Sequence, residues 1–283
     1  MRDVPGERMT VRGIELYVER GGAGQTCVLF ESGAGAGRTL WDPVVSELGD
    51  TVRTVAYDRA GRGRSARVAP PQSLDEMAAT LVALVEVLAP RRLILVGHSM
   101  GGLIVRRAAE SLVPQPIGLV LIDPTPEAAP FYADWAATAA RTDRVLAVQQ
   151  SLARFRPVMR ALTGSYGRMF PADTYETMLR EDFTAAGIAA TRSEFDAFAT
   201  GIGPFRDNPP QPPRGEVVVI SALRADRWHA RRHDTIREYQ RRFADRMNGR
   251  FEDADSEHIV PAESPDRVAA AVLRMAGAPE RTV

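Results

Sequence analysis

The chain has 283 residues, 45% of them hydrophobic, which suits one large domain with a sizeable core. Its 36 basic and 36 acidic residues give a net charge of zero, so the charge does not indicate binding to nucleic acid or to an anionic membrane. The polar first ten residues and the lack of any run of about 18 apolar residues favour neither a signal peptide nor a membrane span, and a cytoplasmic location is the default expectation. Cys27, the only cysteine, lies in an apolar run and is expected to be small, buried and without a disulfide.

The first part of the chain alternates predicted strands and helices. Residues 14–19 alternate apolar and polar side chains, which predicts a half-exposed edge strand. The apolar run at 27–30 predicts a buried central strand, and 52–57 predicts the next strand. Residues 73–88 place apolar side chains at helical spacing and begin with an S-x-x-E capping box. This alternation of strands and helices predicts an α/β fold with a mostly parallel central sheet flanked by helices.

A Gly-rich loop, E-S-G-A-G-A-G at 31–37, follows the first buried strand. Such a loop either cradles a dinucleotide phosphate or places a backbone N–H over an active site. The G-x-G-x-x-G spacing fails, because Arg38 stands where the last glycine should be. We therefore favour an oxyanion hole formed by the backbone N–H groups of Ala34 and Met100. A flexible loop without such a role is the remaining alternative.

The stretch 93–110 predicts a strand, a tight turn and a helix around one serine. The apolar run L-I-L-V leads into G-H-S-M-G-G, which contains a G-x-S-x-G pattern. Glycines suit a strained turn in which backbones pass closely. The turn lifts the Ser99 hydroxyl clear of the sheet and aims the first helical N–H groups at the group that it attacks. We predict that Ser99 is a nucleophile; the plain alternative is a Gly-rich turn with a hydrophilic serine.

The alternation stops from 127 to 213, where no strand-like run occurs. We interpret this segment as a helical cap inserted into a core domain of residues 1–126 and 214–283. Some of its apolar side chains pack the cap against the core and others line a ligand site, but the sequence does not separate the two groups. The predicted helices of the cap cover 135–146, 147–162, 174–185 and 193–199, with breaks at Gly164, Pro171 and Gly187.

A serine hydroxyl needs a base to take its proton, and the chain has four histidines. His98, inside the tight turn, should point away from the serine. His229 and His233 lie in an Arg-rich stretch that we expect to be exposed. His258 lies in a loop after the last predicted strand, at 250–254, and this loop returns over the strand ends toward the serine. We therefore predict that His258 is the base.

An acid is needed to orient the imidazole and stabilise its positive form. Asp123 directly follows the predicted strand at 118–122, and Asp226 lies in an Arg-rich loop after the strand at 216–220. We prefer Asp123, since no gap separates it from its strand, and Asp226 stays the alternative. Asp58 also ends a strand, but an Asp at a turn commonly braces its own backbone, and we expect that role for it.

The order of five motifs resembles that of the capped α/β-hydrolase superfamily, over nearly the whole chain outside the cap. The motifs are E-S-G-A-G at 31–35, D-R-A-G-R-G-R-S at 58–65, G-H-S-M-G-G at 97–102, L-V-L-I-D-P at 119–124 and S-E-H-I-V-P at 256–261. This chain departs from the usual pattern by having Ser32 in place of His in the oxyanion loop and Glu257 in place of Gly before the histidine. Most relatives take the acid at the later position, as Asp226 would be, and some at the position of Asp123.

The resemblance implies hydrolysis of a carboxylic ester, thioester or lactone through an acyl-enzyme. Ser99 would attack, His258 would shuttle the proton, and the Ala34 and Met100 amides would hold the oxyanion. The expected partner is a small to medium apolar substrate, with no nucleic acid and no membrane, and the protein is expected to be a monomer or a homodimer. No metal or cofactor is implied, and no His, Cys or Asp cluster has metal-ligand spacing.

Other functions compete with this one. A Ser-dependent peptidase or a C–C bond hydrolase would use the same triad. A ligand receptor or scaffold could be built on the same fold. An epoxide hydrolase or haloalkane dehalogenase is disfavoured, because those relatives carry Asp where Ser99 stands.

Overall fold

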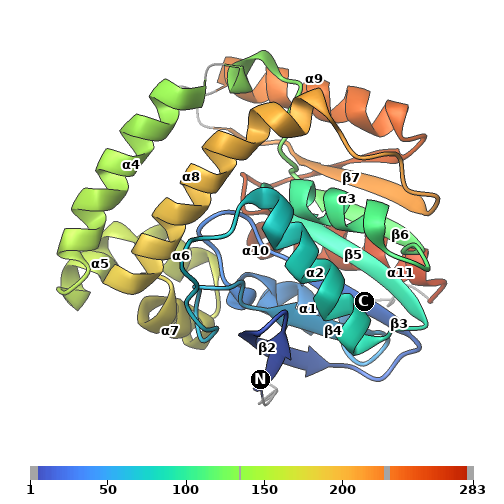
Figure 1. The fold of residues 1–283 in the computed structure, drawn as a ribbon, viewed down its shortest axis with the longest axis horizontal. Coiled ribbons are helices and arrows are strands. Elements are labelled where there is room, and N and C mark those ends of the chain that lie inside the picture. The colour runs from blue at the N-terminus through green and yellow to red at the C-terminus, as the bar shows by residue number, and fades with distance from the viewer. Residues whose placement is uncertain (1–5, 134, 226–229, 279–283) are drawn as a thin grey trace.

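The computed structural model describes residues 6–133, 135–225 and 230–278. In this part of the chain, one eight-stranded sheet is covered by helices on both faces (Figure 1). The strands are β1 Gly6–Val11, β2 Ile14–Gly21, β3 Thr26–Glu31, β4 Arg53–Tyr57, β5 Arg92–His98, β6 Gly118–Ile122, β7 Glu216–Ala222 and β8 Arg250–Ala254. The helices that flank them are α1 Asp42–Leu48, α2 Leu74–Leu88, α3 Gly101–Ser111, α9 Ala230–Arg246 and α11 Pro265–Ala276. Shorter helical turns are η1 Arg38–Trp41, η2 Pro130–Tyr132 and α10 Val260–Glu263.

The strand order is β1-β2-β4-β3-β5-β6-β7-β8, and the neighbours from β4 to β8 are parallel. The chain changes direction across the sheet at β3, because β4 lies on one side of β3 and β5 on the other. In open α/β sheets, such a reversal opens a crevice at the carboxyl ends of the two strands concerned. The Gly-rich loop after β3 and the serine turn after β5 are therefore neighbours.

The predicted strand at 14–19 exists, but its expected place at the sheet edge is wrong. β2 lies between β1 and β4, and β1 pairs with it antiparallel, from Val11 opposite Ile14 outwards. The two turn residues, Arg12 and Gly13, both have positive φ, the twist that a two-residue hairpin requires. The mixed polar sequence of β1 concealed this outer strand, because an edge strand buries little of its surface.

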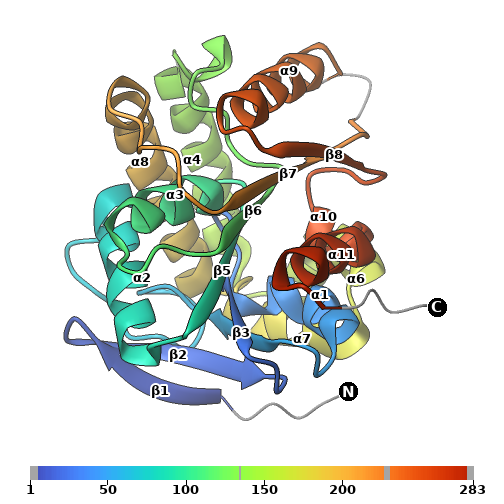
Figure 2. The ribbon, with the colours of Figure 1, turned by 90° about the vertical axis from the view of Figure 1, so that its right-hand side faces the viewer.

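Alternate side chains of the strands enter two separate apolar clusters. In β5, Leu93 and Leu95 join the cluster that includes α2, α3 and α9, while Ile94 and Val96 join the cluster that includes α1 and α11. Figure 2 shows α2 and α3 on one side of the sheet and α1 and α11 on the other. Cys27 belongs to the first cluster and is free and buried, as predicted. Both faces are thus covered, and polar chemistry is left to the ends of the strands.

The chain between β6 and β7 is helical, with connecting loops, wherever the structure describes it. We refer to helices α4–α8 as the lid; two of them, α4 and α8, pack along each other beside the sheet (Figure 1). The expected break at Gly187 is wrong. Gly187 lies in the first turn of α8, where a Cβ would come within 2.2 Å of the Asp182 carbonyl oxygen, so glycine permits close packing there. The lid helices are α4 Trp135–Leu152, α5 Arg156–Leu162, α6 Gly164–Met169, α7 Ala172–Glu181 and α8 Ala185–Asp207.

The predicted helices at 135–146 and 147–162 also differ from the structure, because α4 runs on through 147 and a second helix begins only at Arg156. The capping box of α2 is present as expected, with Ser73 and Glu76 satisfying each other's backbone N–H. Among the helices described, none combines the length and the apolar character that crossing a membrane requires.

Candidate active site

Ser99 lies in the turn between β5 and α3 with a φ of 53°, a left-handed conformation typical of strained turns. Gly97 and Gly101, which flank this turn, have no room for a side chain. A Cβ at Gly97 would lie 2.7 Å from the Gly101 carbonyl oxygen, and a Cβ at Gly101 would lie 2.4 Å from that of Glu31. The glycines therefore let three backbone segments approach, and the Ser99 hydroxyl is left at the C-terminal edge of the sheet.

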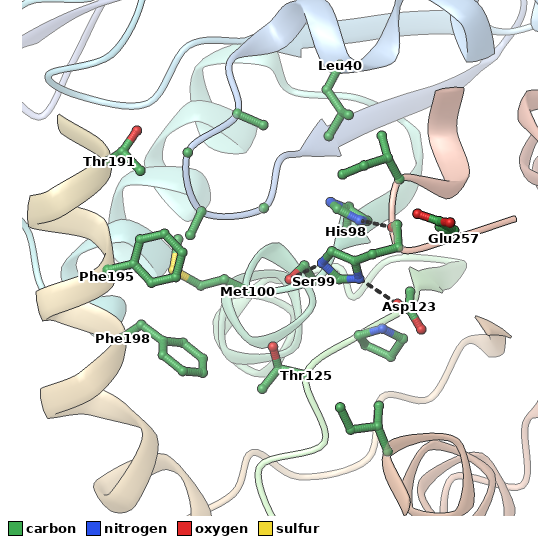
Figure 3. Close-up of a pocket in the computed structure, with 18 of the residues that line it drawn as sticks. Leu40, His98, Ser99, Met100, Asp123, Thr125, Thr191, Phe195, Phe198 and Glu257 are labelled. Atoms are coloured by element: carbon green, nitrogen blue, oxygen red, sulfur yellow. Dashed lines mark hydrogen bonds and ion pairs between the residues drawn. The ribbon is translucent and has the colours of Figure 1, made fainter. Parts of the chain in front are cut away.

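Three side chains from three loops meet at this turn (Figure 3). The Ser99 Oγ lies 3.1 Å from Nε2 of His258, and Nδ1 of His258 lies 2.5 Å from Oδ2 of Asp123. Asp123 directly follows β6, and His258 lies in the loop after β8. The structure thus brings the predicted nucleophile, the predicted base and the preferred acid within hydrogen-bond distance, and their roles in a reaction stay a prediction. The alternative acid, Asp226, and His229 lie outside the described residues.

Asp123 is buried, and both of its carboxylate oxygens have partners. While Oδ2 faces the imidazole, Oδ1 accepts a hydrogen bond from Gln240 Nε2 at 3.0 Å and a longer one from the Ala222 N–H at 3.4 Å. The Ser221 hydroxyl donates to the other end of the Gln240 amide at 2.6 Å. Burial alone would raise the pKa of Asp123, but the hydrogen bond and charge of His258, with the Gln240 amide, hold it below its usual value. Asp123 is therefore ionised and fixed in orientation.

His258 is the member of this group that a substrate can reach. Its side chain is 55% exposed, and it lines the cavity beneath the lid, so this exposure faces the substrate space. Burial by the surrounding protein lowers the pKa of His258, but the hydrogen bond and charge of Asp123 raise it by more, so the net pKa lies above its usual value. Both of the effects that raise the pKa of His258 come from Asp123. A raised pKa favours the protonated form of the imidazole.

His98 turns its ring toward the His258 loop rather than toward Ser99. Its Nε2 lies 2.8 Å from the backbone carbonyl oxygen of His258, and because a carbonyl only accepts, this nitrogen carries the proton. Burial, and then the charge of His258, lower the pKa of His98 to about 3. The centroids of the His98 and His258 rings are 4.8 Å apart. A neutral His98 therefore supports the His258 loop without adding charge to the site.

The predicted oxyanion donors belong to two segments that meet near the serine. Ala34 is in the loop after β3, Met100 directly follows Ser99, and both line the cavity. Among the described residues, neither of these backbone N–H groups donates to another protein atom. The loop passes close to the serine, because a Cβ at Gly33 would lie 3.1 Å from the Cβ of Ser99. N–H groups without a protein acceptor are what an oxyanion hole requires, and this role of Ala34 and Met100 stays a prediction.

A cavity of about 610 Å³ lies between these polar groups and the lid. Phe195 and Phe198 project into it from α8, on the side opposite Asp123 (Figure 3). The volume falls within the usual range for sites that hold small molecules. Further apolar side chains along its wall are Leu40, Tyr132, Trp135, Leu146, Tyr166, Phe183 and Ile188.

Other candidates from the sequence have different surroundings. Asp58 is fully buried and accepts the backbone N–H groups of Arg38 and Arg64, each at 3.0 Å, so it braces its turn as expected. The expectation that His233 is exposed is wrong, because it is half-buried and lines the cavity from α9. The histidine that faces Ser99 is His258. Within the described ranges, no three His, Cys, Asp or Glu side chains are grouped as a metal site.

Sequence reasoning missed Gln240, Arg59 and Glu194. Gln240 carried a signal, because it is a polar residue on the apolar face of α9, between Ile236 and Phe243. Arg59 and Glu194 form a buried ion pair 2.8 Å long that joins the turn after β4 to α8. They are 135 positions apart in the chain, and no local pattern pairs them.

Comparison with known proteins agrees with this fold. The model of the alpha/beta hydrolase family matches residues 28–271, which is most of the chain. The chain belongs to the α/β-hydrolase family. This result confirms the predicted fold class, which the parallel sheet and the serine turn carry.

Individual relatives of this α/β hydrolase match it over only part of its length or at low sequence identity. A protein of Azorhizobium caulinodans named "Putative carbamate hydrolase RutD" is 36% identical over 90 residues, 32% of this chain and 34% of that protein. The chain thus spans about a third of the length of this curated relative. Among solved structures, ALR0039 of Nostoc sp PCC 7120, described as "a putative alpha/beta hydrolase", is 18% identical, with 97% of this chain and 98% of that chain covered and a TM-score of 0.76. The enol-lactonase of Burkholderia xenovorans LB400 is 17% identical, with 96% and 100% covered and a TM-score of 0.65. At these identities the two structures show the shared fold alone.

Proposed function

We propose that this α/β hydrolase is a serine hydrolase that cleaves a carboxylic ester, thioester or lactone of small to medium size. The observation that carries the proposal is the chain of hydrogen bonds from Ser99 through His258 to Asp123, on the wall of an apolar cavity. A base in contact with the hydroxyl, and an acid in contact with the base, are what activates a serine nucleophile.

In the proposed reaction, the Ser99 Oγ attacks the substrate carbonyl carbon while Nε2 of His258 takes the hydroxyl proton. The carbonyl π electrons move onto oxygen, and the Ala34 and Met100 N–H groups stabilise this oxyanion. Asp123 stabilises the imidazolium. The intermediate then collapses, the bond to the leaving oxygen or sulfur breaks, and His258 returns its proton to that atom.

An acyl group is then left on Ser99. A water molecule enters the cavity, His258 takes one of its protons, and the hydroxide portion attacks the acyl carbon. Collapse of the second tetrahedral intermediate breaks the bond to Ser99, which regains the proton from His258. The products are a carboxylic acid and an alcohol, a thiol or, for a lactone, a single hydroxy acid. The Ala34 and Met100 donors serve both intermediates.

A fluorophosphonate probe tests the proposal, because only an activated serine reacts with it quickly. We expect one adduct, mapped to Ser99 by mass spectrometry, that is absent in Ser99→Ala and forms much more slowly in His258→Ala. Multiple turnover of a small chromogenic ester should accompany it. Failure of the folded wild-type protein to form this adduct would overturn the proposal, and a single covalent event without turnover would indicate a receptor.

A carbamate is the second candidate substrate, because a stretch of the chain is 36% identical to a relative named as a carbamate hydrolase. The same serine, histidine and oxyanion donors would serve it. Matched aryl ester and aryl carbamate substrates separate the two candidates. A higher kcat/KM for the ester supports the first proposal, and the reverse ranking supports the second.

A further inference from the structure

The oxyanion loop, residues 31–37, is held by a buried cluster of charges that joins it to the lid. Arg59 follows β4, Glu194 lies in the middle of α8, and both are almost completely buried. Arg59 Nε and one of its terminal nitrogens donate to Glu194 Oε1, at 3.0 and 2.8 Å. The other terminal nitrogen of Arg59 donates to Glu31 Oε1 at 2.6 Å. Arg62 adds a contact to Glu194 Oε1 at 3.2 Å, so the carboxylate is compensated on several sides.

Arg59 fixes the peptide on the N-terminal side of Ala34. Its guanidinium donates to the carbonyl oxygen of Gly33 at 2.8 Å and to that of Ser32 at 2.6 Å. The peptide between Gly33 and Ala34 is trans, so its C=O and N–H point in opposite directions. While Arg59 holds the carbonyl, the Ala34 N–H must point away from Arg59. A flip of this peptide would replace the oxyanion donor by a carbonyl oxygen, which repels an oxyanion.

Glu194 fixes the peptide on the C-terminal side of Ala34. Its Oε2 accepts the backbone N–H of Gly35 at 2.7 Å, while its Oε1 holds Arg59. Burial would raise the pKa of Glu194, but the charges of Arg59 and Arg62 and the Gly35 N–H keep it below its usual value, so the group is ionised. One carboxylate of the lid therefore supports both peptides that flank Ala34.

We propose that Arg59 and Glu194 are positioning residues for the oxyanion hole, and that α8 completes the hole by docking Glu194 onto the oxyanion loop. This inference rests on the proposed serine-hydrolase function. Because α8 also carries Phe195 and Phe198 on the cavity wall, the helix that contacts the substrate is also the helix that sets the oxyanion donor. A lid displaced from the core would leave the triad in place and the oxyanion hole disordered.

Glu194→Gln tests the inference with little change in volume. A glutamine has one acceptor oxygen, so it cannot serve both Arg59 and the Gly35 N–H, and its NH₂ group would face a donor. Glu127→Gln is the matched control. Glu127 is equally buried and accepts two hydrogen bonds from Arg106, at 2.8 and 2.9 Å, but none from the oxyanion loop. Both variants remove one buried carboxylate charge from an arginine pair.

The readout is kcat and KM per active site titrated with the fluorophosphonate, so that unfolded protein does not count. We expect kcat of Glu194→Gln to fall about 10- to 100-fold with KM within about 3-fold, since a misplaced group in a site costs up to about 100-fold. Glu127→Gln should keep both constants within about 3-fold. An equal kcat in the two variants, or a loss confined to KM, would overturn the inference.

A second variant covers the case in which Glu194→Gln does not fold, and the wild-type protein separates failure of the inference from failure of the proposed function. If Glu194→Gln does not fold, Arg59→Lys replaces it, because a lysine keeps the charge but offers a point donor that cannot span the Ser32 and Gly33 carbonyls. The same selective fall in kcat is expected, and an unchanged kcat counts against the inference. If wild-type protein itself forms no adduct at Ser99, the proposed function fails; if it does and the variants match the control, only the inference fails.

Discussion

The cavity has two unlike walls. On the core side, Ser99 and Asp123 are held by turns at the ends of strands and by hydrogen bonds of defined length. On the lid side, the Phe198 ring of α8 is held by edge-to-face packing, its centroid 5.7 Å from that of Tyr132 and 5.3 Å from that of Trp135. Hydrogen bonds depend steeply on distance and angle, whereas apolar contact is not directional. Under the proposed mechanism, the core wall decides which bond breaks and the lid wall decides which molecule is held.

The largest effect should come from the core wall, at Asp123. In Asp123→Asn the charge that stabilises the imidazolium is lost and the amide favours the wrong tautomer of His258, so kcat should fall about 10⁴-fold. Steady-state kinetics on a chromogenic ester measure this. Asp226→Asn makes the same change at the other predicted acid and should stay within about 3-fold. The reverse ranking would transfer the acid role to Asp226.

The support of Asp123 should matter next. Gln240→Met keeps the volume but removes the amide that donates to Oδ1 of Asp123. A hydrogen bond to a charged group contributes about 1.5–3 kcal/mol, so we expect kcat to fall about 10- to 100-fold. The control is the double variant with Asp123→Asn: if Gln240 acts through Asp123, adding Gln240→Met should cost little more. Additive losses would show that Gln240 acts independently.

The lid wall should respond differently. Phe195→Ala removes a ring from the cavity and should raise KM for an apolar ester about 10-fold while kcat stays within about 3-fold, because such a contact holds substrate and transition state alike. Phe155→Ala is the matched control, since that ring lies on the exposed surface of the lid and does not line the cavity. A fall in kcat without a change in KM would erase the distinction between the two walls.

The smallest effect should be a shift in pH dependence. Only neutral His258 can accept the serine proton, and Asp123 keeps its pKa above the ordinary value of 6.5. We therefore expect kcat/KM to be lost as the pH falls through a midpoint above 6.5, about tenfold per unit below it. In Asp123→Asn the midpoint of the residual activity should move to lower pH. An unchanged midpoint would assign the titration to another group.

The sequence predicted the core wall well, for physical reasons. A strained turn restricts its neighbours to glycine, so G-x-S-x-G at 97–101 is visible without a structure. The buried strands could be placed because they are continuous apolar runs. Asp123 could be placed because ligand sites of open α/β sheets form at the carboxyl ends of the strands. The preference for Asp123 over Asp226 stays a prediction, since both follow a strand and Asp226 lies outside the described residues.

The lid wall could not be predicted in the same detail. Apolar residues at helical spacing serve lid packing and the cavity alike, so Phe155, Phe195 and Phe198 look equivalent in the sequence and differ only in what surrounds them. Glu194 reads as one charge on a surface helix, because its partner Arg59 is 135 positions away. Long-range ion pairs leave no periodic signal, and this one became visible only when α8 was placed against the oxyanion loop.

Cys27 has a practical consequence for anyone who wishes to watch the lid. It is the only cysteine of the chain and is 5% exposed, and burial raises the pKa of its thiol, so little reactive thiolate is present. Maleimide reagents should therefore label the folded native protein very little. A cysteine introduced at Val148, which is 61% exposed on α4, would accept a single fluorophore on the lid. The emission of that dye could then report changes in the surroundings of the lid in real time, without first removing a native thiol.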